Sequence, residues 1–213
     1  MRYKHIIWDW NGTVVNDSWL SFEILESFLD RLGLKKITLQ DYRDNFSFPV
    51  IDFYRKLGFD ISKDRFDRLG EDFIKRFRAK ERECKLNPGA LELMEKIGSL
   101  GVGQSVLSAY QKDCLKDAVK FFGAEKYMSN IVGLDDVKAN TKLETGKAFI
   151  SSLGVDPSEI LIIGDTDHDF AVASSCKTDC FLIALGHQSF SRLSKTSARV
   201  FESFEDMSKA LFG

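Results

Sequence analysis

Five residues with carboxylate, hydroxyl or ammonium groups are spread along this 213-residue sequence at comparable places. Each follows a short apolar run or begins a helical pattern, rather than lying inside one. In an open parallel sheet, ligands bind beyond the carboxyl ends of the strands, so residues at such places can meet although they are distant in sequence. The five residues are Asp9, Ser108, Lys142, Asp165 and Asp169.

Together these residue types favour phosphoryl transfer to a carboxylate. The Asp9 carboxylate can attack phosphorus, but two anions repel, so positive charge is needed around the phosphoryl group. Asp9, Asp165 and Asp169 can hold Mg²⁺, a hard cation that prefers oxygen ligands. Lys142 and Ser108 can bind the phosphoryl oxygens. The sequence therefore predicts a phosphoryl-transfer site with Mg²⁺ as its cofactor.

The loop after Asp9 and the choice of lysine complete this predicted site. Gly12 and Thr13 allow backbone N–H groups to approach phosphoryl oxygens in a tight turn. Lys142 is preferred to Lys138 and Lys147 because it begins a helical pattern, from which a lysine can turn back toward the strand ends. We therefore predict that Gly12, Thr13, Ser108 and Lys142 bind the substrate.

Alternating strand and helix patterns must position these residues. Short β-rich runs alternate with segments in which apolar residues recur three or four positions apart. Such alternation predicts parallel strands joined by right-handed crossovers, in an α/β layered domain. The predicted strands are residues 3–8, 102–107, 131–132, 160–163, 181–185 and 199–201.

The interval Ser18–Arg82 breaks this alternation because it shows helical periodicity alone. Leu25, Phe28, Leu29 and Leu32, for example, share one face of a helix. This interval reads as an all-helical insertion after the first strand of the sheet domain.

Turn residues flank the insertion on both sides. The segment 16–18, Asn-Asp-Ser, supplies turn and N-cap residues, and the segment 87–89, Asn-Pro-Gly, supplies a second turn. We therefore predict a core domain of residues 1–16 and 84–213, and an inserted domain of residues 17–83.

Composition and charge exclude several classes of protein. Lys and Arg number 30 and Asp and Glu number 32, so the net charge of −2 gives no reason to bind nucleic acid or an anionic membrane. No apolar run approaches the roughly 20 residues that span a bilayer, and we read no signal peptide. The four cysteines include no C-x-x-C pair. We expect a cytoplasmic protein, monomer or homodimer, with a small-molecule substrate.

Two motifs frame the predicted site. The first is Asp9-Trp10-Asn11-Gly12-Thr13, and the second runs from Gly164 to Asp169 as Gly-Asp-Thr-Asp-His-Asp. With Ser108 and Lys142 between them, they follow the order of D-x-D-x-T, a Ser or Thr, a Lys, and G-D-x-x-x-D. The sequence thereby resembles the haloacid dehalogenase superfamily of phosphatases, and its layout is most similar to the phosphoglycolate phosphatase-like branch.

The resemblance implies a role for each matching residue. Asp9 would be the nucleophile and a magnesium ligand, and Asp165 the carboxylate ligand from the last motif. Asp169 would bind the metal through water or support a ligand, and Ser108 and Lys142 would bind the transferring phosphoryl group. The implied fold is α/β, a Rossmann-like three-layer parallel sheet core with an inserted all-helical cap domain.

One position departs from the family pattern. Asn11 stands where the family has its second motif-one Asp, the general acid and base. The backbone carbonyl of Asn11 can still complete the metal coordination, but a neutral amide cannot exchange a proton with the leaving group or water. His168 or a water chain could substitute, although orienting a neighbouring carboxylate is the more ordinary role for this histidine.

The predicted function is magnesium-dependent hydrolysis of a small, phosphoglycolate-like phosphate monoester through an aspartyl phosphate on Asp9. One alternative is a carbon–phosphorus hydrolase resembling phosphonoacetaldehyde hydrolase, which lacks the same Asp and uses a cap lysine to form an imine. Lys35, Lys36 and Lys56 are the candidates for that lysine. The other alternative is a weakly active phosphate-binding homologue. Substrate choice is expected to involve the cap turn at residues 45–49, Asn-Phe-Ser-Phe-Pro.

Overall fold

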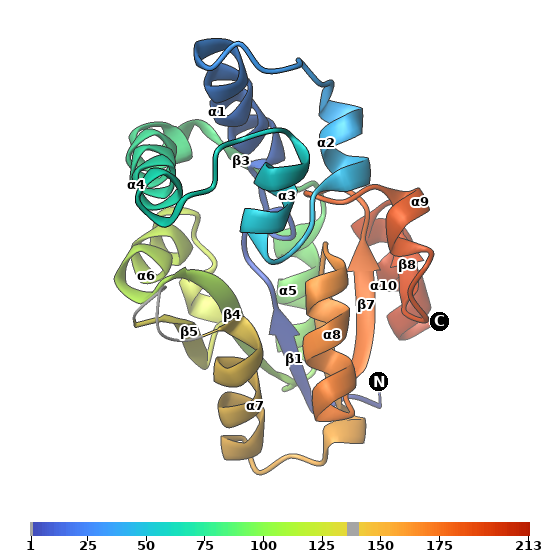
Figure 1. Ribbon diagram of the computed structural model, residues 1–213. Helices are drawn as coiled ribbons and strands as arrows, with labels where there is room; N and C mark the ends of the chain where they lie inside the picture. The colour runs from blue at the N-terminus through green and yellow to red at the C-terminus, as the bar shows by residue number, and fades with distance from the viewer. Residues whose placement is uncertain (1, 136–140) are drawn as a thin grey trace.

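A six-stranded sheet forms the centre of the computed structural model, which describes residues 2–135 and 141–213 (Figure 1). Every neighbouring pair of strands is parallel, in the order β5-β4-β1-β6-β7-β8. This arrangement confirms the predicted parallel sheet, although the strand predicted at 181–185 begins and ends two residues earlier. The strand predicted at 102–107 continues to Gln111, so Ser108 lies inside it rather than after it. The strands are β1 His5–Trp8, β4 Gly103–Gln111, β5 Asn130–Leu134, β6 Ile160–Gly164, β7 Asp179–Ile183 and β8 Arg199–Phe201.

Helices cover both faces of this sheet, which gives the predicted three layers (Figure 1). In β1, Ile6 and Trp8 belong to one apolar core and Ile7 belongs to the other, because successive side chains of a strand point to opposite faces. The helices of the first face are α5 Ala90–Ser99, α6 Lys112–Phe121 and α10 Phe204–Phe212. Those of the second face are α7 Lys142–Ser152, α8 Asp167–Cys176 and α9 Phe190–Leu193.

A group of four helices is inserted between β2 and β3, as the periodicity of the sequence predicted. In Figure 1 these helices lie beyond the carboxyl end of β1, so they form a cap over that end of the sheet. Within the cap α1 packs on α4, where the guanidinium carbon of Arg76 lies 5.3 Å from the ring centroid of Phe28. The cap helices are α1 Ser18–Arg31, α2 Leu39–Asn45, α3 Val50–Lys56 and α4 Lys63–Lys80.

A short antiparallel ribbon joins the cap to the core. β2 (Val15–Asn16) pairs with β3 (Lys85–Leu86), so the chain enters and leaves the cap at one place. The predicted domain boundaries fall beside this ribbon, and the division itself stays a prediction. Three 3₁₀ turns complete the described elements, namely η1 Glu81–Glu83, η2 Glu125–Tyr127 and η3 Pro157–Glu159. No helix within residues 2–135 and 141–213 is long and apolar enough to cross a membrane.

Candidate active site

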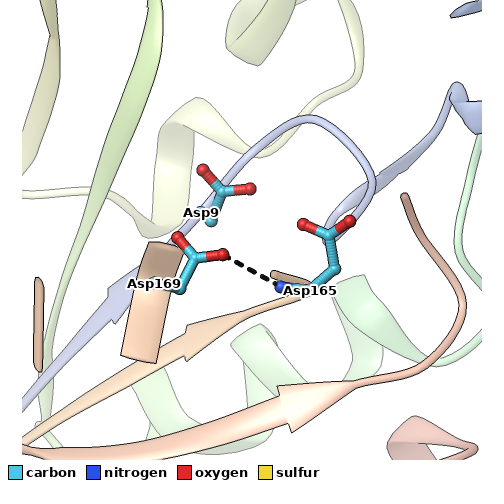
Figure 2. A group of neighbouring side chains, drawn as sticks. All are labelled: Asp9, Asp165 and Asp169. Carbon is cyan, nitrogen blue, oxygen red and sulfur yellow. Dashed lines mark hydrogen bonds between the residues drawn. The ribbon is translucent and has the colours of Figure 1, made fainter. Parts of the chain in front are cut away.

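Three carboxylates meet at the carboxyl ends of the two central strands. Asp9 follows β1 and Asp165 follows β6, while Asp169 lies in the first turn of α8 (Figure 2). Each of the three is at most 7% exposed, and each offers one oxygen within 4.8 Å of the others. The backbone N–H of Asp9 donates to Ile163, which continues the pairing of β1 and β6 into the site. The structure therefore brings together the three acidic residues predicted from sequence.

The ammonium group of Lys142 lies between two of these carboxylates. Lys142 is the first residue of α7, whose start is fixed by reciprocal hydrogen bonds between Thr141 and Glu144. Its Nζ donates to Asp9 Oδ1 and, at 2.5 Å, to Asp169 Oδ1. Of the other lysines considered, Lys147 is exposed on the same helix, and the remaining one, at position 138, lies outside the described residues.

The charges of this cluster do not balance. Burial raises the pKa of Asp9 well above its usual range. The charge of Lys142 opposes this rise, and the charges of Asp169 and Asp165 add to it. Burial also raises the pKa of Asp165 to about 6. With three carboxylates and one ammonium group, the ionised cluster carries excess negative charge that a divalent cation would neutralise. The donor set of the site therefore fits a metal ion such as Mg²⁺.

Asp169 is already saturated with protein hydrogen-bond donors. Its Oδ2 accepts from the backbone N–H of Asp165 at 3.2 Å (Figure 2) and from the N–H and hydroxyl of Thr166 at 3.0 and 2.7 Å. Burial would raise the pKa of Asp169, but Lys142 and Thr166 lower it below its usual value. This geometry suits a carboxylate that orients Lys142 and the adjacent loop better than one that binds a metal directly.

The loop after Asp9 is held against Asp165. Gly12 has a positive φ of 78°, and a Cβ at this position would lie 2.2 Å from Asp165 Oδ2, so only glycine fits. The Asn87 side chain donates to the carbonyls of Gly12 and Thr13 at 2.9 and 2.8 Å. The Thr13 hydroxyl lies 3.1 Å from Asp165 Oδ1 and 3.3 Å from Asp9 Oδ2.

The backbone N–H of Gly12 already has acceptors within the protein. It donates to the carbonyl of Val15 at 2.9 Å and to Asp17 Oδ1 at 2.7 Å. A phosphoryl oxygen would have to displace one of these acceptors. The predicted binding of phosphoryl oxygens by Gly12 and Thr13 stays a prediction.

The side chain of Asn11 is oriented by the buried carboxylate of Asp17. Its amide nitrogen donates to Asp17 Oδ2 at 2.5 Å. The segment 16–18 was predicted to supply turn and N-cap residues, and Asp17 is the N-cap residue of α1, although its side chain makes no capping hydrogen bond. Instead its carboxylate accepts hydrogen bonds from the Asn11 amide and the Gly12 N–H.

His187 is the main site residue that sequence reasoning missed. Its Nε2 lies 3.4 Å from Asp17 Oδ1, its Nδ1 is hydrogen-bonded to the Tyr42 hydroxyl at 2.9 Å, and its backbone N–H donates to Asp165 at 2.6 Å. Burial lowers the pKa of His187, but the hydrogen bond and charge of Asp17, with Asp165 and Asp9, raise it to about 9. The residue follows β7, so the strand-end rule that found Asp9 would have found it too.

Ser108 and His168 occupy different positions around the carboxylates. Ser108 is 2% exposed and stands in β4 just where regular pairing with β5 ends. Its hydroxyl accepts from the Tyr110 N–H at 3.2 Å. His168 stacks on Phe48 of the cap with ring centroids 4.8 Å apart, and burial lowers its pKa, which favours the neutral imidazole.

A cavity of about 390 Å³ joins the carboxylate cluster to the cap. Phe46 and Phe48 line it, so the turn predicted to reach the site at residues 45–49 does reach it. Tyr42, from α2, has no signal in the sequence that separates it from ordinary cap packing. The predicted site residues that line the cavity are Asp9, Asn11, Ser108, Lys142 and Asp165.

Comparison with known proteins gives the class to which this fold and site belong. Residues 6–183 match the family described as haloacid dehalogenase-like hydrolase, so the chain belongs to that family and is a hydrolase. This confirms the resemblance seen in the two motifs.

Individual relatives are more distant. The chain is 26% identical over 188 residues to a phosphoglycolate phosphatase from Aquifex aeolicus, covering 85% of each chain. It is 22% identical over 174 residues to the pyrophosphatase PpaX from Halalkalibacterium halodurans, covering 79% of this chain and 78% of the relative. A haloacid dehalogenase-like hydrolase from Streptococcus pneumoniae has a similar fold, with a TM-score of 0.82, 19% identity, and coverage of 100% of this chain and 99% of the other.

Proposed function

We propose that this hydrolase is a magnesium-dependent phosphatase that cleaves a small phosphate monoester through an aspartyl phosphate on Asp9. The observation that carries the proposal is the buried cluster of Asp9, Asp165 and Asp169 around the Lys142 ammonium group. The named phosphatases among the relatives support the same reaction class. In this proposal residues 17–83 are the cap over a core of residues 1–16 and 84–213.

Asp9, Asp165 and the backbone carbonyl of Asn11 are the groups that would hold Mg²⁺. The metal would supply positive charge that screens the phosphoryl oxygens from the attacking carboxylate. Asp169 would keep Lys142 directed at the phosphoryl site, because its Oδ1 accepts from Lys142 while three further donors hold its Oδ2. Lys142 and the Ser108 hydroxyl would bind phosphoryl oxygens.

The reaction divides into two displacements at phosphorus. In the first, an oxygen of the Asp9 carboxylate forms a bond to phosphorus while the bond to the leaving oxygen breaks, and the departing alkoxide takes up a proton. In the second, water attacks phosphorus, gives up a proton, and frees phosphate and the Asp9 carboxylate. Asn11 can neither give nor take these protons, although it holds its place through Asp17.

The positions of the cap lysines favour this reaction over carbon–phosphorus cleavage. An imine-forming lysine must reach the substrate and is usually buried so that its amine is neutral. Lys35, Lys36 and Lys56 are exposed, and Lys36 pairs with Asp30 on the surface. Among the described residues, Lys142 is the lysine that lines the cavity.

Phosphate release from a panel of monoesters, assayed with Mg²⁺ and with EDTA, tests the proposal. We expect turnover that requires Mg²⁺, and a phosphorylated peptide containing Asp9 after acid quench. Turnover of phosphonoacetaldehyde that borohydride blocks would select the carbon–phosphorus hydrolase. Phosphate binding without turnover of any ester would select the phosphate-binding homologue.

A further inference from the structure

The cavity above the carboxylates has two unlike ends. Its floor is the charged cluster, whereas its cap side is built chiefly from aromatic and aliphatic side chains of α1, α2, α3, α4 and the turn between α2 and α3. Phe48 and Ile74 are 38% and 45% exposed, so part of this wall is accessible to solvent. Six of the wall residues are Phe46, Phe48, Phe66, Leu69, Phe73 and Ile74.

The cap side of the cavity offers no charge partner for a second anionic group. Among the described lining residues, Lys142 is the sole Lys or Arg, and it is bound by Asp9 and Asp169. His187 is held by Asp17. A carboxylate or second phosphate placed against the buried part of the cap wall would be desolvated without a partner, which is strongly unfavourable.

Two of the tyrosine hydroxyls that line the cavity, one from the cap and one from β4, already have hydrogen-bond partners. The Tyr42 hydroxyl is hydrogen-bonded to His187, and the Tyr110 hydroxyl donates to Glu81 at 2.6 Å. What the wall presents to a ligand is therefore chiefly ring faces, ring edges and methyl groups, which stabilise apolar groups by removing them from water.

The volume of the cavity exceeds the needs of a two-carbon substrate. An apolar cavity of about 150 Å³ is enough to hold benzene, and this one measures about 390 Å³. It can therefore hold a phosphoryl group on the floor together with a ring-sized group against the cap.

We propose that the substrate is a phosphate monoester whose organic part is apolar and about the size of an aromatic ring, in preference to phosphoglycolate or pyrophosphate. This rests on the proposed phosphatase function. The phosphoryl group lies on the carboxylate floor, and the organic group lies against Phe46, Phe66, Leu69 and Phe73. Specificity then comes from the cap wall, which does not touch the reacting atoms.

The first experiment compares 2-phenylethyl phosphate with ethyl phosphate, 2-phosphoglycolate and pyrophosphate. Phenylethyl and ethyl phosphate both release a primary alkoxide, so their difference reports binding of the ring rather than chemistry. Each buried methylene contributes about 0.8 kcal/mol, about fourfold, so a buried ring should raise kcat/KM at least about tenfold. We expect phosphoglycolate and pyrophosphate to be poorer than phenylethyl phosphate by a similar factor or more.

Gly70 allows the cavity to be narrowed from the cap. It lies within α4 and lines the cavity, and an added Cβ meets no heavy atom within 4 Å. Gly70→Leu should lower kcat/KM for phenylethyl phosphate at least about tenfold more than for ethyl phosphate. Gly98→Leu is the matched control, because Gly98 is an exposed helical glycine of α5 outside the cavity, and we expect it to change neither rate.

Calorimetric binding of the non-hydrolysable 2-phenylethylphosphonate and ethylphosphonate separates this inference from the proposed function. If no ester is hydrolysed but the phenylethyl compound binds at least about tenfold more tightly, the phosphatase assignment fails and the apolar subsite stands. If ethyl phosphate or phosphoglycolate is the better substrate, or the two phosphonates bind equally, the subsite is overturned while the phosphatase assignment stands. Equal losses for both esters in Gly70→Leu would also overturn it.

Discussion

The floor and the cap wall of the cavity are stabilised by different kinds of contact. On the floor, every carboxylate oxygen of Asp9, Asp165 and Asp169 lies near a protein donor, and the backbone around them is fixed by strand pairing. On the wall, phenylalanine rings meet one another through apolar contacts, with a distance of 5.5 Å, for example, between the ring centroids of Phe46 and Phe53. A charged floor demands one geometry, whereas an apolar wall tolerates many substitutions that preserve volume.

The largest expected effect comes from removing the proposed nucleophile on the floor. Asp9→Asn should lower kcat by at least about 10³-fold, because a covalent mechanism has no substitute for the attacking oxygen. Phosphate release measures the loss, and circular dichroism checks that the fold is kept. Asp113→Asn, at an exposed position of α6, is the control and should behave as the unmodified protein. Activity above a few per cent in the Asp9 variant would move the nucleophile elsewhere.

Removing the cation of the floor should have the next largest effect. Lys142→Met takes away the positive charge between Asp9 and Asp169, so kcat/KM should fall about 10²–10³-fold. Leaving buried carboxylates without their partner should also cost about 3 kcal/mol of unfolding free energy at neutral pH. Lys147→Met removes an exposed lysine from the same helix and should change neither quantity. Similar losses in both variants would mean that the losses come from changing α7 itself and not from removing the ion pairs of Lys142.

His187 contacts both regions, because it is hydrogen-bonded to Asp165 on the floor and to Tyr42 in the cap. The pH dependence of stability tests whether its imidazole is charged. Its pKa of about 9 exceeds the value of about 6.5 in an unfolded chain. A raised folded-state pKa gives stability that is complete below pH 6.5 and is lost as the pH rises through 9. Urea unfolding in EDTA should therefore show a decrease between these pH values of up to about 3 kcal/mol that is absent in His187→Gln. Parallel curves for the two proteins would show that Asp17 does not hold a charged imidazole.

The sequence predicted the floor far better than the wall, and the reason is geometric. Parallel strands align their carboxyl ends, so Asp9 and Asp165 could be placed at the same edge of the sheet from strand runs alone. Lys142 could be chosen over Lys147 because a helix start faces the strand ends. His187 was missed although it follows β7 at the same edge of the sheet, since it belongs to neither of the two motifs.

The cavity-lining residues of the cap could not be predicted in the same way, because apolar periodicity is expected both for helix packing and for a ligand-binding wall. Phe66, Leu69 and Phe73 show the spacing of an ordinary helix packed on its neighbour, and they do pack against the core cluster. The same residues also line the cavity, and nothing in their spacing separates packing from binding. Asp17 is the N-cap residue of α1, within the segment predicted to supply one, but its contact with Asn11 was not predicted because it depends on how the loop closes.

The last prediction concerns Asn11, where the floor departs from the family pattern. In the structure its amide donates to Asp17 at 2.5 Å. Asn11→Asp would place two carboxylates at that distance, and like charges so close cannot both ionise, so one proton is retained between them. That proton becomes a potential acid for a leaving alkoxide. We expect kcat for ethyl phosphate to rise about tenfold, below the roughly 10²–10⁴-fold of a fully placed general acid, because Asp17 competes for the proton.

Esters with different leaving groups show whether Asn11→Asp supplies a general acid or instead improves substrate binding. A nitrophenolate departs without protonation, so 4-nitrophenyl phosphate should gain little from Asn11→Asp while ethyl phosphate gains most. Asn130→Asp, at an exposed position of β5, controls for added charge. Equal gains for both esters would point to altered metal or substrate binding. A loss for both would mean that the floor requires a neutral residue beside Asp17, because a second carboxylate there adds negative charge that Lys142 and a bound cation do not offset.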